Sequence, residues 1–308
     1  MSGQAIAADR RRATAASPDD GTAAGRASHP VAYRSLPALY ARLAGATVRS
    51  QLQYRWSFAL YALGVFCANG FEFLALLVLF GQAPSLGGWS APEVALLWGM
   101  STMSFAVAEA FGGGFEKLHM VVRAGEFDRV LARPLPVFFQ VMTSQVEAHR
   151  AGRLAQGMVA VAFAVTEGSL PTWGAGEVAR LLGAVLSGAV IFFATFVIGG
   201  AWSFVTVDGS EVVNAFTYGG TTLACSPLDL FAAPVRRAAT WVFPLAFVNY
   251  VPALALLGRP DATGILPAGI DPSGPLAVLL VPAVALAFLG VASLAWRAGL
   301  RRYQGAGS

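Results

Sequence analysis

The residues that could do chemistry are few in this sequence, and their spacing forms no catalytic or metal-binding pattern. The three histidines, His29, His119 and His149, are not spaced like metal ligands. The two cysteines, Cys67 and Cys225, lie far apart in apolar stretches and form no C-x-x-C pair. We therefore expect no catalytic residues, no metal site and no disulfide framework.

Lys117 is the only lysine among the 21 basic residues, and it bears on whether the chain binds ATP by itself. A P-loop needs a lysine within the motif G-x-x-x-x-G-K-[ST], where it contacts the phosphates. Glu116 precedes Lys117 and Leu118 follows it, so this lysine does not fit the motif. We expect that the chain is not an ATPase and that any role driven by ATP requires a partner chain.

Two glutamates lie within otherwise apolar stretches. Glu72 falls in the run 57–80, and Glu109 falls at the end of the run 92–111. An acid at membrane depth is costly and often functional, so both are candidates for a translocation pathway. A second interpretation stays open for Glu109, because an acid near the interface can reach water or pair with an arginine of the following loop.

The composition indicates which elements must position these residues. Of the 308 residues, 56% are apolar and only 12% are charged, against about 25% charged in an ordinary soluble domain. So few charges cannot cover the outside of so apolar a globule. This excludes a cytosolic enzyme and a disordered protein, and it predicts an all-α polytopic membrane protein.

We predict six transmembrane helices, since about 20 apolar residues cross the hydrocarbon. Five fit the runs 57–80, 92–111, about 136–165, 178–207 and 275–296, with Gly112–Gly114 expected to break the second. The remaining span is either 211–228 or 238–257, both of which carry polar residues or prolines. The other segment would be re-entrant or interfacial, which is permitted where protein buries its backbone.

The N-terminal region has a different composition from the spans. Residues 1–34 are rich in Ala, Gly, Ser and Arg and lack the apolar core of a secretory signal, which predicts a disordered cytoplasmic leader. Residues 35–56 place apolar and arginine side chains at helical spacing, which predicts an amphipathic interfacial helix. Residues 57–308 then form the six-span domain.

The distribution of positive charge predicts the orientation. Seventeen of the 21 basic residues fall in the region before the first span, in the segment 112–153 and after the last span. Because cytoplasmic loops carry the excess of Lys and Arg, both termini and the segment 112–153 are expected to be cytoplasmic. Arg236 and Arg237 are left undecided by this count. The abundance of Arg and Ala in the sequence is typical of a bacterium with GC-rich DNA. We therefore expect the chain to lie in a bacterial cytoplasmic membrane.

The cytoplasmic segment contains the most informative motif, GEFDRVLARPLPVFFQ, at residues 125–140. Gly125 can take a left-handed turn, Glu126 and Asp128 suit the positive end of a short helix, and Pro134 ends it. A short helix with mixed charge and an apolar centre suits docking into a groove on a soluble partner. An ordinary solvated loop helix is the alternative.

This motif resembles the G-x-(L/F)-D-x-x-L-x-R-P…Q signature of ABC-2 type transporter permeases. Further segments resemble that family in the same order along the chain: QYRW at 53–56, GWSAPEVALLWGM at 88–100, SPLDLF…FPLAFVNYVPALALLG at 226–258 and GLRRYQGAGS at 299–308. The resemblance covers about residues 50–308.

The resemblance implies the permease subunit of an ATP-driven ABC exporter, paired with a second copy or a similar chain. A separate ABC ATP-binding subunit would hold ATP and Mg²⁺, and this chain would bind no cofactor and no nucleic acid. A coupling helix within 116–134 would contact that subunit. The residues assigned to this contact are Glu126, Asp128, Arg129, Leu131, Arg133 and Pro134. The family pattern makes 211–228 the fifth span and 229–258 a pair of re-entrant helices.

Two other classes of function are alternatives to an ATP-driven exporter. An ATP-independent secondary transporter favours an inverted repeat and ionisable groups at the midplane, and only Glu72 is near that depth. A lipid-modifying enzyme in the membrane needs clustered His, Asp or Glu at one face, and the histidines are scattered. The aromatic residues in 231–250 predict a belt at the interface, with contact to a lipid or drug as the alternative.

Overall fold

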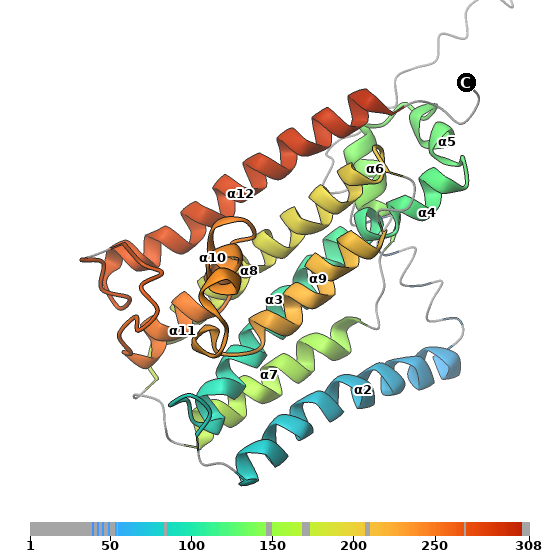
Figure 1. The fold of residues 1–308 in the computed structure, drawn as a ribbon. Helices are drawn as coiled ribbons and strands as arrows, with labels where there is room; N and C mark the ends of the chain where they lie inside the picture. Colours follow the sequence, from blue (N-terminus) through green and yellow to red (C-terminus); the bar gives the residue numbers. More distant parts are fainter. Residues whose placement is uncertain are drawn as a thin grey trace, which may run out of the picture. The chain divides into compact units, whose positions relative to one another are not determined.

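The computed structural model describes residues 39, 42, 45, 49 and 53 and the ranges 55–82, 85–145, 150–167, 173–206, 210–267 and 269–303. The long helices belong to the compact unit Arg42–Ser308. The predicted leader, 1–34, and most of the predicted interfacial helix, 35–56, lie outside the described residues. The described residues form helices and no sheet (Figure 1), so the fold is all-α as expected.

Four long helices coincide with four of the predicted apolar runs. They are α2 (Arg55–Gln82), α3 (Ala91–Glu116), α8 (Ala175–Trp202) and α12 (Pro275–Arg302). Each is long and apolar enough to cross a membrane, and within the described part of the chain they make four candidate spans, or five if a bent pair counts as one. Two shorter helices, α7 (Ala151–Thr166) and α9 (Ser210–Ala224), occupy the places expected for the third and fifth spans.

The helices form a bundle around α3, which is the most deeply buried of the four candidate spans (Figure 1). Helices α7 and α8 pack on α3, while α12 packs on α8 and α2 packs mainly on α7 at the periphery. Large apolar side chains point outward from the peripheral helices, for example Phe71 on α2 and Leu286 on α12, which are 67% and 64% exposed. A large apolar surface is unfavourable in water, whereas it is favourable in contact with the hydrocarbon chains of lipids.

The predicted break at Gly112–Gly114 is wrong, because α3 continues through these glycines to Glu116. Each glycine instead lies against a neighbouring element. A Cβ atom at Gly112 would lie 2.7 Å from Phe196 Cδ2, and one at Gly114 would lie 1.8 Å from the carbonyl oxygen of Val141. The small residues weaken the helix locally but permit close packing, and the packing decides the outcome.

Three short helices join α3 to α7 at one end of the bundle (Figure 1): α4 (Leu118–Arg123), α5 (Phe127–Leu131) and α6 (Val137–Thr143). Gly125 has a φ of 68°, in the left-handed region that the sequence predicted for it. Glu126 is the N-cap of α5, and the chain leaves this helix before Pro134. The short helix expected in this loop is therefore present, at the bounds of α5.

A bent pair of helical segments lies between α9 and α12, toward the other end of the bundle (Figure 1). Helix α10 (Ala233–Trp241) and the segment Leu245–Leu257, made of η4 (Leu245–Phe247) and α11 (Tyr250–Leu257), meet at 76°. The break falls at Pro244, which cannot donate a backbone hydrogen bond. This geometry is that of a broken span or a re-entrant loop.

The carboxylate of Asp229 holds together the segments that lie beside this bent pair. Asp229, in η3 (Leu228–Leu230), accepts hydrogen bonds from Trp89 Nε1 at 2.8 Å and from the Tyr250 hydroxyl at 2.6 Å. Arg259 pairs with Glu93 at 2.9 Å and stacks on the ring of Trp89 at 4.3 Å. The start of α3, the 3-10 turn and the start of α11 are therefore held together.

Candidate functional site

Helix α5 is anchored to the bundle by an aromatic side chain. Phe127 is fully buried, and its ring centroid lies 4.9 Å from the ring centroids of both Phe204 and Tyr303. Phe204 follows the end of α8, and Tyr303 follows the end of α12. One side chain of this five-residue helix is thus held by two long helices that are distant in sequence.

Polar contacts complete the anchoring of α5. Gln140 on α6 donates hydrogen bonds to the backbone carbonyls of Val130, at 3.0 Å, and Leu135, at 2.9 Å. The Tyr303 hydroxyl donates to Asp128 Oδ1 at 3.0 Å. Partial burial and the neighbouring carboxylate raise the pKa of Tyr303, so its hydroxyl keeps the proton that it donates at neutral pH.

The six residues assigned from the sequence to contact a partner all have exposed side chains. They are Glu126, Asp128, Arg129, Leu131, Arg133 and Pro134, which we call the α5 face. Leu131 is 43% exposed, although it is apolar. The α5 face thus offers one apolar side chain among charged ones on a helix whose other side is fixed.

The positioning of α5 depends on residues that the sequence assignment did not include. Phe127 and Gln140 stand in the same motif, but their types alone do not tell that one is the anchor and the other holds the turn. Tyr303 lies 175 residues from Asp128, so no local signal could have paired the two.

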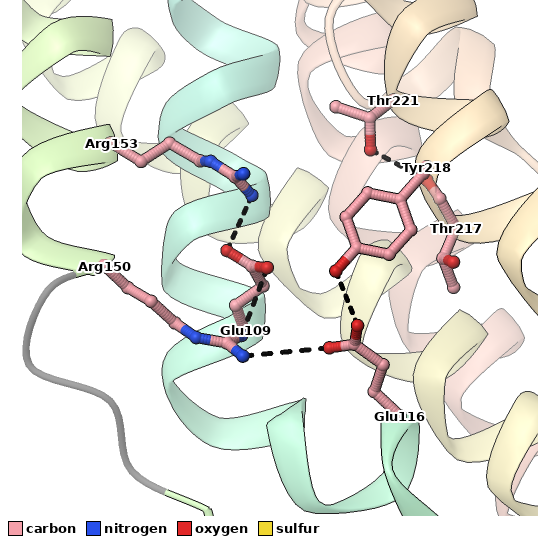
Figure 2. Close-up of polar contacts among 7 residues, drawn as sticks. All are labelled: Glu109, Glu116, Arg150, Arg153, Thr217, Tyr218 and Thr221. Carbon is pink, nitrogen blue, oxygen red and sulfur yellow. Dashed lines mark hydrogen bonds and ion pairs between the residues drawn. The ribbon is translucent and has the colours of Figure 1, made fainter. Parts of the chain in front are cut away.

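A second site is a cluster of polar and charged side chains near the C-terminal end of α3, the end that leads to α5 (Figure 2). Glu109 Oε1 lies 3.1 Å from Arg150 Nη1, and Glu109 Oε2 lies 2.7 Å from Arg153 Nη1. Arg150 Nη2 lies 3.8 Å from Glu116 Oε2, and the Tyr218 hydroxyl donates to Glu116 Oε1 at 2.5 Å. We call these five residues the polar cluster.

The polar cluster is largely buried, apart from Tyr218, which is 42% exposed, and it is balanced in formal charge. Glu109 is 4% exposed and Arg150 is 9% exposed. Two carboxylates face two guanidinium groups, as burial of charge requires, and Arg153 also stacks on the ring of Phe105 at 5.0 Å. A cavity of about 210 Å³ adjoins the cluster and is also lined by Tyr61, Val65 and Lys117. The cluster connects α3, the start of α7 and α9.

The two glutamates assigned to a pathway are not brought together. Glu109 pairs with arginines that follow it in sequence, which was the second interpretation of its place in the chain. Glu72 has an exposed side chain on α2, and it lies about two helical turns beyond Val65, the nearer α2 residue that lines the cavity. A pathway role for either residue stays a prediction.

The comparison with protein families decides the class of the molecule. A family model described as an ABC-2 family transporter protein matches residues 66–307. The chain belongs to this family. A search of curated proteins and a search of solved structures gave no match.

Membership in the ABC-2 family makes the chain a multi-pass membrane protein of a transporter. The membrane domains of this family have no catalytic activity of their own. Within the described ranges, no three His, Cys, Asp or Glu side chains come together as a possible metal site.

Proposed function

We propose that this chain is the membrane-spanning subunit of an ATP-driven ABC exporter and forms half of a translocation path. The six spans would be α2, α3, α7 with α6, α8, α9 and α12, with both termini in the cytoplasm. A separate ATP-binding subunit would hold ATP and Mg²⁺, and a second copy or a similar chain would complete the path. Family membership and the excess of arginine near the α5 end support this proposal.

The α5 face is the observation on which the proposal depends most. Its exposed side chains present mixed charge around Leu131, which suits a groove on a soluble subunit. Its other side is fixed to α6 by Gln140 and to the ends of α8 and α12 through Phe127. A displacement of α5 by the partner would therefore be transmitted directly to three helices.

The polar cluster gives this displacement a route to the remaining helices. Glu116 ends α3, and α4 begins two residues later at Leu118. Through Arg150 and Tyr218, Glu116 is connected to α7 and α9. ATP-driven closure of two partner subunits would thus move the spans between two packed arrangements and open or close the central path.

Removing the apolar centre and reversing one charge of the α5 face tests the contact with the partner. We expect Leu131→Asp with Arg133→Glu to lower co-purification of the ATP-binding subunit by at least about tenfold, because an interfacial apolar contact and a charge contact are lost. The measurement is the amount of ATP-binding subunit retained on a tagged permease after co-expression.

A matched control is Leu230→Asp, because Leu230 is also 43% exposed but belongs to the other end of the bundle. This control should retain the ATP-binding subunit at the wild-type level. Wild-type co-purification by the double variant would show that α5 is not the contact. Substrate transport by the chain without an ATP-binding subunit would favour a secondary transporter instead.

Cysteine labelling tests the orientation independently. In a background with Cys67 and Cys225 replaced by Ala, we expect a membrane-impermeant maleimide to label Leu230→Cys in sealed spheroplasts. Leu131→Cys should be labelled only after the membrane is opened, because the α5 face is expected to be cytoplasmic. Labelling of Leu131→Cys in sealed spheroplasts would reverse the proposed topology.

A further inference from the structure

A cavity at α10 contains two neighbouring arginines that the transport proposal does not use. Arg236 and Arg237 line it together with Thr240, Trp241 and the loop 263–265, and its volume is about 240 Å³. A water molecule occupies about 30 Å³ in the liquid, so the cavity has room for a polar group larger than one water.

The charge in this cavity is not compensated by the groups that line it. None of the described residues lining it is an acid, and among the described residues no ion pair joins Arg236 or Arg237 to a carboxylate. The nearby Asp261 carboxylate accepts three hydrogen bonds from its own loop, two from Thr263 and one from the backbone of Leu266. The two guanidinium groups therefore suit an anion supplied from outside the chain.

Three arginines of the bundle are ion-paired instead. Arg150 and Arg153 face Glu109, and Arg259 faces Glu93. On the proposed outer side, arginines without an ion-pair partner are also exceptions to the rule that Lys and Arg are concentrated on the cytoplasmic side. A function for Arg236 and Arg237 would account for this departure, and this step rests on the proposed orientation.

The surroundings of the cavity indicate a membrane lipid as the source of the anion. Trp241 is 73% exposed and Val242 is 62% exposed, and they follow Arg237 by four and five residues in the sequence. Tryptophan and arginine at the end of a span lie at the level of the lipid headgroups, where one side is apolar and the other carries phosphate. Guanidinium groups bind phosphate through paired, charge-assisted hydrogen bonds.

We propose that Arg236 and Arg237 bind the phosphate of an anionic phospholipid, with its acyl chains beside Trp241 and Val242. Thr240 already donates its hydroxyl to the carbonyl oxygen of Arg236, at 2.7 Å, which fixes the turn of α10 that carries both arginines. Bound lipid would tie the bent pair to the outer leaflet.

The test compares lipid binding by the wild-type chain and by Arg236→Gln/Arg237→Gln in detergent. The probe is short-chain phosphatidylglycerol, and the readout is the concentration that gives half of the maximal rise in melting temperature. We expect this concentration to be about tenfold or more higher for the variant, because two charge-assisted contacts are lost. Inorganic phosphate at equal concentration should give no comparable rise.

The matched control is Arg301→Gln/Arg302→Gln, which removes two adjacent charges at the other end of the bundle. It should respond to phosphatidylglycerol like the wild type. Equal responses of the wild type and the α10 variant would overturn the site, and an equal rise with inorganic phosphate would overturn the assignment to lipid. Binding in detergent does not depend on orientation, so failure here is distinguishable from failure of the cysteine labelling.

Discussion

Glu109→Gln should destabilise the folded chain by about 3–5 kcal/mol, the cost of removing one partner from a buried ion pair. Glu109 is 4% exposed, and its two carboxylate oxygens each face a guanidinium group. A neutral amide leaves the polar cluster with an excess positive charge in surroundings of low dielectric constant. The measurement is the melting temperature in detergent, followed by size-exclusion chromatography of the heated sample.

Two further variants separate the effect of charge from that of packing. Glu72→Gln removes an acid with an exposed side chain from α2 and should change the melting temperature little. Glu109→Gln/Arg153→Gln restores the balance, because Glu116 still faces Arg150, and it should be more stable than Glu109→Gln alone. A single Glu109→Gln variant as stable as the wild type would mean that the cluster does not hold α3 and α7 together.

Gly114→Ala should also destabilise the folded chain, in this case through packing alone. The added Cβ would lie 1.8 Å from the carbonyl oxygen of Val141 and 2.5 Å from Ser144 Oγ. The first contact is with backbone, so α3 and α6 must separate, and overpacking of this kind costs about 1–3 kcal/mol or more. Because α6 carries Gln140, which holds the α5 turn, we also expect weaker binding of the ATP-binding subunit.

The matched control for this variant is Gly290→Ala on α12, where an added Cβ would meet nothing within 4 Å. It should leave the melting temperature unchanged or raise it, because alanine is favoured over glycine in a helix by up to about 1 kcal/mol. If Gly114→Ala and Gly290→Ala have the same melting temperature, the close approach of α3 and α6 is not required for the fold.

Local features of the sequence predicted the structure where the physical cause is itself local. A run of about 20 apolar residues indicates a span without reference to other helices, and α2, α8 and α12 lie at the predicted runs. The left-handed conformation of Gly125 was also predicted correctly, because such a turn depends on one residue and its neighbours.

Features that depend on distant residues were predicted poorly. Gly112–Gly114 indicated a break when judged by helix propensity, yet their role is decided by Val141 and Phe196. The partners of Glu109 lie more than 40 residues away, so the sequence left pairing and pathway as alternatives. The contact of Phe127 with Phe204 and Tyr303 joins three segments that only the folded chain brings together.

The way α5 is held has a consequence for ionic strength. Its anchor is a group of three uncharged rings, whose contacts are not screened by salt, whereas its exposed face carries Arg129 and Arg133. The Debye length falls from about 10 Å at 0.1 M salt to about 3 Å at 1 M. Concentrated salt should therefore release an ATP-binding subunit held by these charges while α5 keeps its place on the bundle, which offers a gentle route to the isolated membrane subunit.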